Sequence, residues 1–433
     1  MEDILCLTFA DMAEQSKKRR KYSNNKSILV VNDEWGTAKG GISTINREVA
    51  ITAANNGIDV HALTLSTTSE DKDDAFENGV TLITPKIKKH LQDKDPRPDW
   101  FVLHESFFPT LGCNVTGVET IIGHLPITGN EAISLKEELF PGKKLVLFNH
   151  VIPEDIEPYK DGWTPEKVQN RERALFEIAA KADVVFSVGP RMYRHFENKY
   201  RAYTSKTVCH KKFLPQPSKR FFDIEIRKPK DDGQMQILTF GRILGVEELK
   251  GYDIVAKAVG RAVKTLRKVK PQCSPVWVIR GVPKEEHQQT REFLNKSHDC
   301  DFLEIKLYPY GTQDDIRMDL KQSHVCVMGS RSEPFGLVGM EAIASGLPVL
   351  VTANSGLADF LYESFRLEAK EMVVDVGVGE IGTGKDIEIW ADRVTQILMD
   401  YDYAFKFAQR MKKSLQNCDA INDSQIEFRR FCF

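Results

Sequence analysis

The chain has 433 residues, with 60 Lys and Arg against 62 Asp and Glu, a formal net charge of −2 and 41% hydrophobic residues. This length is about three times that of a typical domain, so we expect two large domains with substantial cores. The charge balance gives no reason to expect nucleic acid or an anionic membrane as the main partner. No apolar run approaches the roughly 18 residues that a membrane-spanning helix needs.

Residues 1–26 are expected to form a flexible basic tail. The basic run 17–21 is followed there by a polar Ser-Asn-Asn-Lys-Ser stretch, which is typical of a solvated segment. A targeting signal is the alternative interpretation of the run.

The cysteines indicate the compartment. Eight of them are scattered along the chain without a CxxC pair, which is typical of free thiols in a reducing compartment and not of disulfides or a zinc site. The first residues, Met-Glu-Asp, lack the basic start and the apolar stretch of a signal peptide. We therefore expect a cytoplasmic protein.

From Ser27 the chain alternates short apolar runs with helix-compatible stretches. Residues 28–31 form a continuous apolar run, typical of a buried parallel strand, and a glycine-bearing loop follows at 36–41. Further strands are predicted at 60–65, 81–83, 101–103, 120–122, 145–148 and 184–188. This alternation predicts an α/β domain with a doubly wound parallel sheet over residues 27–218, ending in a proline-bearing linker at 214–218.

A second series of strands begins after the polar turn at 231–233. Its members are predicted at 237–240, 276–279, 304–307, 324–328, 348–351 and 372–374. A long region rich in Ala, Leu, Lys and Arg, residues 386–416, is predicted to be helical. We expect a second α/β domain over 219–400 and a helical tail over 401–433.

The most informative segment is Ser-Glu-Pro-Phe-Gly-Leu-Val-Gly-Met-Glu-Ala, residues 332–342. It follows the predicted strand at 324–328, and ligands of open α/β sheets bind outside the carboxyl ends of the strands. Pro334 disfavours helix before it, and Gly346 ends the helix, which leaves a helix of about nine residues starting near Gly336. Such a glycine-opened helix N-terminus is a site for phosphate or diphosphate.

Two carboxylates flank this anion site. Glu333 lies in the loop before the helix and Glu341 lies inside it. Because carboxylates repel phosphate, we expect both to accept hydrogen bonds from uncharged hydroxyl groups. A diphosphate between two hydroxyl-rich groups describes a nucleotide sugar.

A pair of cations follows the first strand of the same half. Arg242 comes directly after the strand at 237–240, and Lys250 precedes Gly251. Cations near glycines suit a diphosphate leaving group, with each charge-assisted hydrogen bond contributing about 1.5–3 kcal/mol. The alternative is that Lys250 is a solvated residue and Gly251 an ordinary turn.

At these residues the chain resembles a retaining glycosyltransferase of the GT-B fold. The similarity is to the broad group, glycosyltransferase family 4-like, that contains glycogen, sucrose and sucrose-phosphate synthases and bacterial mannosyltransferases. Glu333 and Glu341 match the E-x7-E motif of that group, and Arg242 and Lys250 match its paired diphosphate-binding residues. The resemblance is specific over residues 237–361 and weaker over 28–230.

The resemblance implies an architecture. It consists of two Rossmann-like domains facing across a cleft, the first on the acceptor side and the second binding the nucleotide sugar. The helical tail then packs back on the first domain.

The resemblance also implies roles for residues of the second domain. Arg242 and Lys250 neutralise the donor diphosphate, Glu341 holds the ribose hydroxyls, and Glu333 holds the hydroxyls of the transferred sugar. The amides of Gly336, Leu337 and Val338 touch the distal phosphate or the sugar. The base lies against residues 308–310.

In the first domain the matches are to a loop and a histidine. Lys39, Gly40 and Gly41 resemble the glycine loop that approaches the diphosphate. His150 matches the histidine near the reacting sugar carbon, and His124, at the end of the preceding predicted strand, is its rival. A lone histidine at a strand end is more often a structural hydrogen-bonding residue.

The function expected from this resemblance is transfer of a hexose from a UDP- or GDP-linked donor to a hydroxyl acceptor, with retention of configuration. The acceptor is a glycan, a small molecule or a lipid head group. No cofactor beyond the donor and no metal is expected, because no DxD motif lies at a strand end. A non-catalytic sugar-nucleotide-binding module acting as a scaffold or sensor is the main alternative; a phosphorylase or epimerase and a dehydrogenase-like Rossmann protein are weaker ones.

Overall fold

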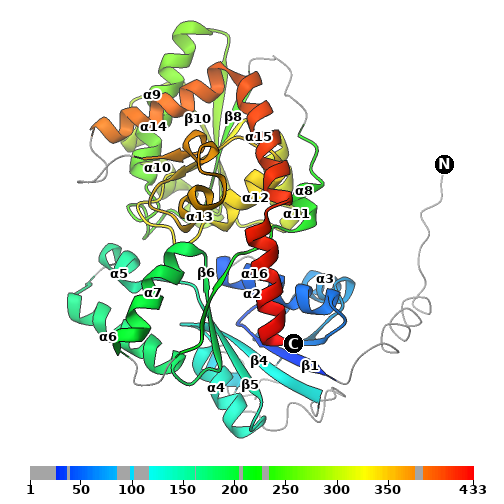
Figure 1. Ribbon diagram of the computed structural model, residues 1–433. Coiled ribbons are helices and arrows are strands. Elements are labelled where there is room, and N and C mark those ends of the chain that lie inside the picture. The colour runs from blue at the N-terminus through cyan, green and yellow to red at the C-terminus, as the bar shows by residue number, and fades with distance from the viewer. Residues whose placement is uncertain are drawn as a thin grey trace, which may run out of the picture. The chain divides into compact units, whose positions relative to one another are not determined.

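A computed structural model describes residues 26–36, 40–84, 98–101, 117–160, 162–203, 208–226, 234–375 and 384–433 (Figure 1). The expected basic tail, of which only Lys26 is described, and Lys39 of the glycine loop lie outside these residues. Helices and parallel strands alternate along the described chain, as the sequence predicts. Among the described residues, no helix is both long enough and apolar enough to cross a membrane.

The first sheet has the strand order β3-β2-β1-β4-β5-β6-β7 among the described residues. Its strands are β1 Ser27–Val31, β2 Asp59–Leu63, β3 Val80–Ile83, β4 Val118–Leu125, β5 Lys144–Asn149, β6 Val184–Val188 and β7 His210–Phe213. The order of the strands across the sheet changes direction at β1, which pairs in parallel with both β2 and β4. The helices that connect these strands along the chain are α2 Gly41–Asn55, α3 Ser69–Glu77, α4 Gly129–Glu138, α5 Pro153–Ile156, α6 Pro165–Ala179 and α7 Pro190–Tyr203.

The second sheet has the order β10-β9-β8-β11-β12-β13, with parallel pairing throughout. Its strands are β8 Gln234–Phe240, β9 Ser274–Arg280, β10 Glu304–Tyr308, β11 Val325–Met328, β12 Val349–Thr352 and β13 Val373–Val374. Here the order reverses at β8, whose neighbours are β9 and β11. The loops that leave β8 and β11 therefore start side by side at the carboxyl edge of this sheet, where ligands bind in such folds.

Helices cover the second sheet. They are α8 Lys219–Phe222, α9 Tyr252–Val269, α10 His287–Ser297, α11 Gln313–Gln322, α12 Leu337–Ser345, α13 Gly356–Phe365, α14 Gly384–Met399 and α15 Tyr401–Gln416. The last helix, α16 Asp419–Cys432, ends on the first sheet instead. α9 and α14 pack against each other (Figure 1), and their apolar faces join a buried cluster around Trp277. The Trp277 indole N–H donates to Thr239 Oγ1 at 2.9 Å, so this polar group stays satisfied inside the core.

By its contacts the chain divides into two compact units. The first comprises residues 1–148, 178–185 and 427–433, and the second comprises 149–177 and 186–426. Within the first unit the end of α16 is tied to the sheet, because Thr120 Oγ1 donates to the carbonyl of Cys432 at 2.7 Å and Lys144 Nζ donates to that of Phe431 at 2.6 Å. The domain boundaries at 218 and 400 expected from the sequence stay a prediction.

Three local differences separate the structure from the predicted elements. Phe101 ends a 3-10 helix, Pro98–Phe101, so the strand predicted at 101–103 is wrong at this residue, and the other two positions lie outside the described ones. β7 was not predicted, because its His-Lys-Lys-Phe sequence lacks an apolar run. The helical region at 386–416 is two helices, since the Asp400 carboxylate accepts the Tyr403 N–H at 3.3 Å and caps a new helix, α15.

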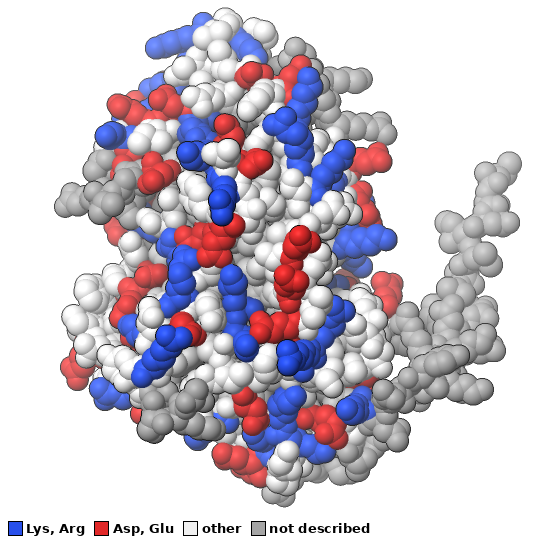
Figure 2. Space-filling view, viewed as in Figure 1, with Lys and Arg blue, Asp and Glu red and all other residues white. Residues whose placement is uncertain are grey.

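The charge on the surface is mixed. On the face shown in Figure 2, basic and acidic side chains are interspersed over the described residues. This agrees with the near-neutral net charge of the whole chain.

Candidate active site

The loop between β11 and α12 carries the segment that the sequence analysis singled out. Gly336 caps the N-terminus of α12 with φ +109°, and Gly346 ends it with φ +83°, both in the left-handed region that favours glycine. The helix between them has nine residues, which confirms the predicted element. No acidic residue occupies its first turn, so the free amides and the positive end of the helix dipole are available to an anion.

The backbone of this loop is fixed against the start of α13. The Glu333 N–H donates to the Asn354 carbonyl at 3.0 Å, and the Gly356 N–H donates back to the Glu333 carbonyl at 3.0 Å. The Leu357 N–H donates to the Phe335 carbonyl at 2.7 Å. These bonds hold Glu333 and Phe335 in one conformation relative to α13.

Lys250 reaches the same loop from the segment between β8 and α9. The following residue, Gly251, caps α9 with φ +66°, and a Cβ on it would lie 2.0 Å from the carbonyl oxygen of Gly329. This close approach brings Lys250 Nζ to 2.7 Å from Glu333 Oε2. The two side chains are 31% and 16% exposed, so the ion pair is partly shielded from water. The structure therefore brings together two residues that lie 83 positions apart in the sequence.

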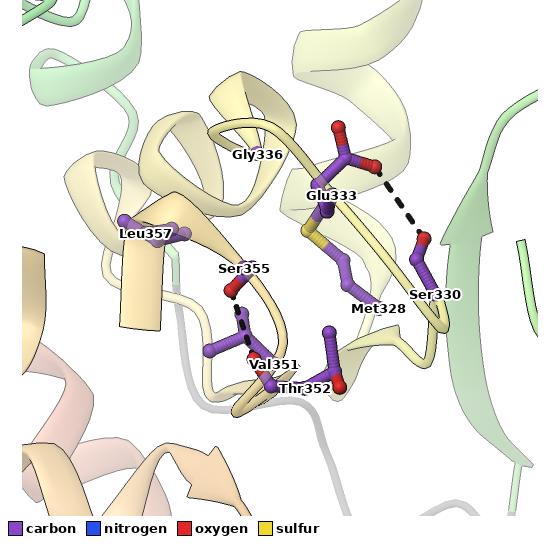
Figure 3. Close-up of a pocket in the computed structure, with 8 residues that line it drawn as sticks. All are labelled: Met328, Ser330, Glu333, Gly336, Val351, Thr352, Ser355 and Leu357. Atoms are coloured by element: carbon purple, nitrogen blue, oxygen red, sulfur yellow. Dashed lines mark hydrogen bonds between the residues drawn. The ribbon is translucent and has the colours of Figure 1, made fainter. Parts of the chain in front are cut away.

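A small hollow lies beside Glu333 (Figure 3). It has an empty volume of about 170 Å³ and is lined by Met328, Ser330, Glu333, Gly336, Val351, Thr352, Ser355 and Leu357. The Ser330 hydroxyl donates to Glu333 Oε2 at 3.4 Å, and the Ser355 hydroxyl donates to the Thr352 carbonyl at 2.8 Å. This volume includes space open to solvent and lies below the roughly 300–1,000 Å³ of usual ligand pockets, so the hollow does not by itself enclose a ligand.

Arg242 and Tyr310 share the electrostatic surroundings of Lys250. Arg242 follows β8 and is exposed. Burial raises the pKa of Tyr310, while the positive charges of Arg242 and Lys250 act in the opposite direction. The two cations and the aromatic residue predicted to lie against the base therefore belong to one neighbourhood.

Glu341 lies inside α12 and is buried. It lies close to Cys326 of β11: burial raises the pKa of that thiol to about 12, and the negative charge of Glu341 adds to the effect. Glu341 thus lies on the side of α12 that faces β11, five residues after the Gly336 cap.

The side chain of Arg331 supports the start of α9 and was not singled out from the sequence. Its guanidinium donates to both carboxylate oxygens of Asp253, at 2.7 and 2.8 Å, and to the Glu248 carbonyl at 2.6 Å. This fork joins the β11 loop to the segment that carries Lys250. The only sequence signal is the position of Arg331, two residues before Glu333 in the motif loop.

His124 is a structural residue. It is completely buried at the end of β4, and its Nε2 lies 2.9 Å from Asn46 Oδ1. Burial lowers its pKa to about 3, so the imidazole stays neutral near neutral pH. The geometry thus fits the structural role that a lone strand-end histidine usually has.

His150 and the glycine loop lie in different units. His150 follows β5, is buried, and belongs to the second unit. Gly40 caps α2 of the first unit with φ +118°, and Gly41 is the first residue of that helix. Their predicted roles at the reacting carbon and at the diphosphate stay predictions.

One group of possible metal ligands occurs in the described part of the chain. Glu154, Glu172 and His195 offer ligand atoms within 4.8 Å of one another. Lys199 Nζ contacts both carboxylates, at 2.7 Å from Glu172 Oε2, and His195 Nε2 lies 2.8 Å from Glu172 Oε1. The ammonium group already supplies the positive charge that this cluster needs.

Comparison with known proteins identifies the family. A model described as family 4 glycosyltransferase in conflict systems matches residues 29–423. The chain belongs to this family. The resemblance to the glycosyltransferase family 4-like group is therefore confirmed.

Curated relatives match over shorter stretches. The lipopolysaccharide core biosynthesis glycosyltransferase LpsE of Rhizobium meliloti is 31% identical over 120 residues, which cover 27% of this chain and 32% of that protein. D-inositol 3-phosphate glycosyltransferase of Pseudarthrobacter chlorophenolicus is 30% identical over 132 residues, or 30% of each chain. The alignments thus span a quarter to a third of the lengths of the curated relatives.

Solved structures resemble this family 4 chain over nearly its whole length. Sucrose-phosphate synthase from Thermosynechococcus elongatus has a TM-score of 0.67 at 17% identity, covering 94% of this chain and 98% of that one. HepE of Anabaena, in complex with UDP and glucose, has a TM-score of 0.60 at 14% identity, with coverage of 94% and 98%. These similarities show the GT-B fold with two Rossmann-like domains, which confirms the predicted fold class.

Proposed function

We propose that this chain is a retaining hexosyltransferase that moves a hexose from a UDP- or GDP-linked donor to a hydroxyl acceptor. The observation that carries the proposal is the 2.7 Å pair of Lys250 and Glu333 at the Gly336-capped N-terminus of α12. A cation and a helix N-terminus suit a diphosphate. A carboxylate beside them suits the hydroxyls of a sugar.

The donor binds in extended form along this edge of the second sheet. Arg242 and Lys250 neutralise the diphosphate, and the backbone N–H groups of Gly336, Leu337 and Val338 donate hydrogen bonds to the distal phosphate or the sugar. Glu333 holds the hydroxyls of the transferred sugar. On the other side of the diphosphate, Glu341 holds the ribose, and the base lies against Tyr310. HepE, which shares the fold, was solved with UDP and glucose, which supports a nucleotide-linked hexose.

The transfer step takes place on one face of the sugar. The bond between the anomeric carbon and the diphosphate oxygen breaks, and a bond from that carbon to the acceptor oxygen forms. The departing diphosphate oxygen takes the proton of the acceptor hydroxyl. Lys250 and Arg242 stabilise the negative charge that grows on the leaving group, which is usually the largest catalytic contribution. The proposal also assigns His150 to the reacting carbon and Gly40 and Gly41 to the diphosphate.

Transfer proceeds without a metal ion in this proposal. Two cationic side chains and the α12 N-terminus supply the positive charge that a divalent cation provides in other glycosyltransferases. The expected result is that a chelator leaves turnover unchanged within about twofold. A loss of activity on chelation that added Mg²⁺ or Mn²⁺ restores would contradict this part of the proposal.

We also place the protein in the cytoplasm as part of the proposal. Among the described residues, the six cysteines, Cys209, Cys273, Cys300, Cys326, Cys418 and Cys432, are all free thiols, which suits a reducing compartment. Cell fractionation tests it, and recovery outside the cytoplasm would refute it.

The first experiment is calorimetric titration of UDP, GDP and ADP into the wild-type chain. Micromolar binding of one nucleotide would support the proposal and name the base. Turnover of the matching nucleotide sugar then separates an enzyme from the alternative, a non-catalytic module that binds sugar nucleotides. Failure of all three nucleotides to bind would refute the proposed donor site.

A further inference from the structure

Arg191 has an unusual position for a cation. It is the second residue of α7, where the positive end of the helix dipole disfavours a positive charge. Its partners lie outside its own helix: Nη2 donates to the Ala353 carbonyl at 2.9 Å, and Nε donates to Asp359 Oδ2 at 3.1 Å. The side chain is only 24% exposed. The cation is therefore held at this site by residues of another segment.

The two partners of Arg191 bracket the segment on which the motif loop rests. Ala353 precedes residues 354–357, and Asp359 follows them in α13. Three of these four residues, Asn354, Gly356 and Leu357, form backbone hydrogen bonds with Glu333 or Phe335. Arg191 thus holds both ends of the short stretch that fixes the backbone of Glu333.

A second contact joins the start of α7 directly to the motif loop. Gly189 precedes the helix with φ +87°, and a Cβ on it would lie 2.3 Å from Cδ2 of Phe335. Phe335 is 3% exposed and also packs near the ring of Phe360. The start of α7 therefore contacts the motif loop at Phe335, and Arg191 contacts residues 353 and 359, which flank the stretch that fixes this loop.

We propose that Arg191 is a positioning residue that sets the place of the Glu333 carboxylate through residues 353–359. It does not itself touch the donor. The expected effect of Arg191 on kcat rests on the proposed function, whereas its effect on the conformation of the loop does not. Removal of Arg191 loosens the loop and leaves Arg242 and Lys250 in place.

Arg194 offers a matched control on the same helix. It donates to Asp359 Oδ2 at 2.7 Å and to Glu363 Oε1 at 2.5 Å, and both of these partners lie in α13. It is 53% exposed. Arg194→Ala therefore removes an arginine and two ion pairs to α13. It leaves the bond from Arg191 to the Ala353 carbonyl, which lies before residues 354–357, in place. Arg191→Lys keeps the charge but loses the planar fork.

Hydrogen exchange of the full chain without any ligand tests the inference first. In Arg191→Ala, the amides of Glu333, Gly356 and Leu357 should exchange on the order of tenfold faster, because the support of their hydrogen bonds is lost. In Arg194→Ala they should stay within about twofold of the wild type. Equal rates in the two variants, or no change in Arg191→Ala, would overturn the proposal.

Kinetics with the preferred donor provide the second test. Arg191→Ala should lower kcat on the order of 10–100-fold, because small misplacements of a positioned group have effects of this size. The Kd for the nucleoside diphosphate should change less than threefold, and Arg191→Lys should recover part of kcat. If kcat falls equally in Arg194→Ala, the positioning role is refuted. If the wild type binds no nucleotide, the proposed function fails, while the exchange result still decides the role of Arg191.

Discussion

Replacement of Lys250 by alanine tests the candidate site most directly. The substitution removes the ammonium group 2.7 Å from Glu333 Oε2 and leaves that carboxylate with the Ser330 hydroxyl at 3.4 Å. It also removes the cation assigned to the donor diphosphate. Both the binding of nucleotide and the transfer step should therefore weaken.

The expected magnitude follows from the two partners of the ammonium group. A charge-assisted bond to the diphosphate contributes about 1.5–3 kcal/mol. Without a ligand the same ammonium group pairs with Glu333. Loss of this partly exposed pair (31% and 16%) on nucleotide binding offsets about 0.5–1 kcal/mol of that contribution. The net loss of nucleotide affinity is about 0.5–2.5 kcal/mol, or roughly 2–70-fold in Kd. Turnover should fall further, on the order of 10²–10³-fold, because charge on the leaving group is greatest in the transition state.

The assay is calorimetric titration of the preferred nucleotide followed by steady-state turnover of its sugar conjugate. Lys264→Ala is the matched control, because Lys264 Nζ also pairs with a carboxylate, Asp299 Oδ2 at 2.8 Å, on an exposed part of the same unit. The control should leave both quantities within about twofold. A loss of turnover below threefold in Lys250→Ala would refute the role assigned to this lysine.

Three further experiments test other parts of the structure. Gly251→Ala should lower the free energy of unfolding in urea by about 2–4 kcal/mol, because its Cβ meets a carbonyl oxygen at 2.0 Å. Gly57→Ala, with φ +79° and open space around the Cβ, should lower it by only about 1 kcal/mol. Equal losses in the two variants would contradict the clash. Glu341→Gln should weaken binding of the nucleoside diphosphate about 10-fold but leave pyrophosphate binding unchanged, and a parallel loss of both would exclude a ribose contact. His124, with its pKa lowered from 6.5 to about 3, stays neutral while the unfolded chain gains a proton below pH 6.5, so stability falls as pH drops. Between pH 7 and 5 the wild type should lose about 2 kcal/mol more than His124→Gln, and identical losses would show that another group is responsible.

The strands of both sheets were largely predictable because buried parallel strands are continuous apolar runs. β1, β6 and β12 show this most clearly, with every residue buried. β7 escaped prediction because its two lysines are only partly buried. The break between α14 and α15 was missed because a single capping residue, Asp400, interrupts an otherwise helical composition.

The candidate site was predictable only in part. The order of strand, loop and helix around Glu333 follows from local sequence signals. The contact between Lys250 and Glu333 does not, because it depends on β8 and β11 being neighbours in the sheet. Arg191 lies 168 residues before Asp359, and its only local signal is a cation in the first turn of a helix, where the dipole disfavours it.

The end of α16 sets the order in which the units can be completed during synthesis. Thr120 and Cys432 are 312 residues apart, and Lys144 and Phe431 are 287 apart. At roughly 5–20 residues per second, the β4 strand leaves the ribosome about 15–60 seconds before its partner in α16 exists. The second unit is complete by residue 426, before residues 427–433 of the first have been made. The first unit is therefore completed after the second, and the surface of its sheet that α16 contacts stays uncovered until then.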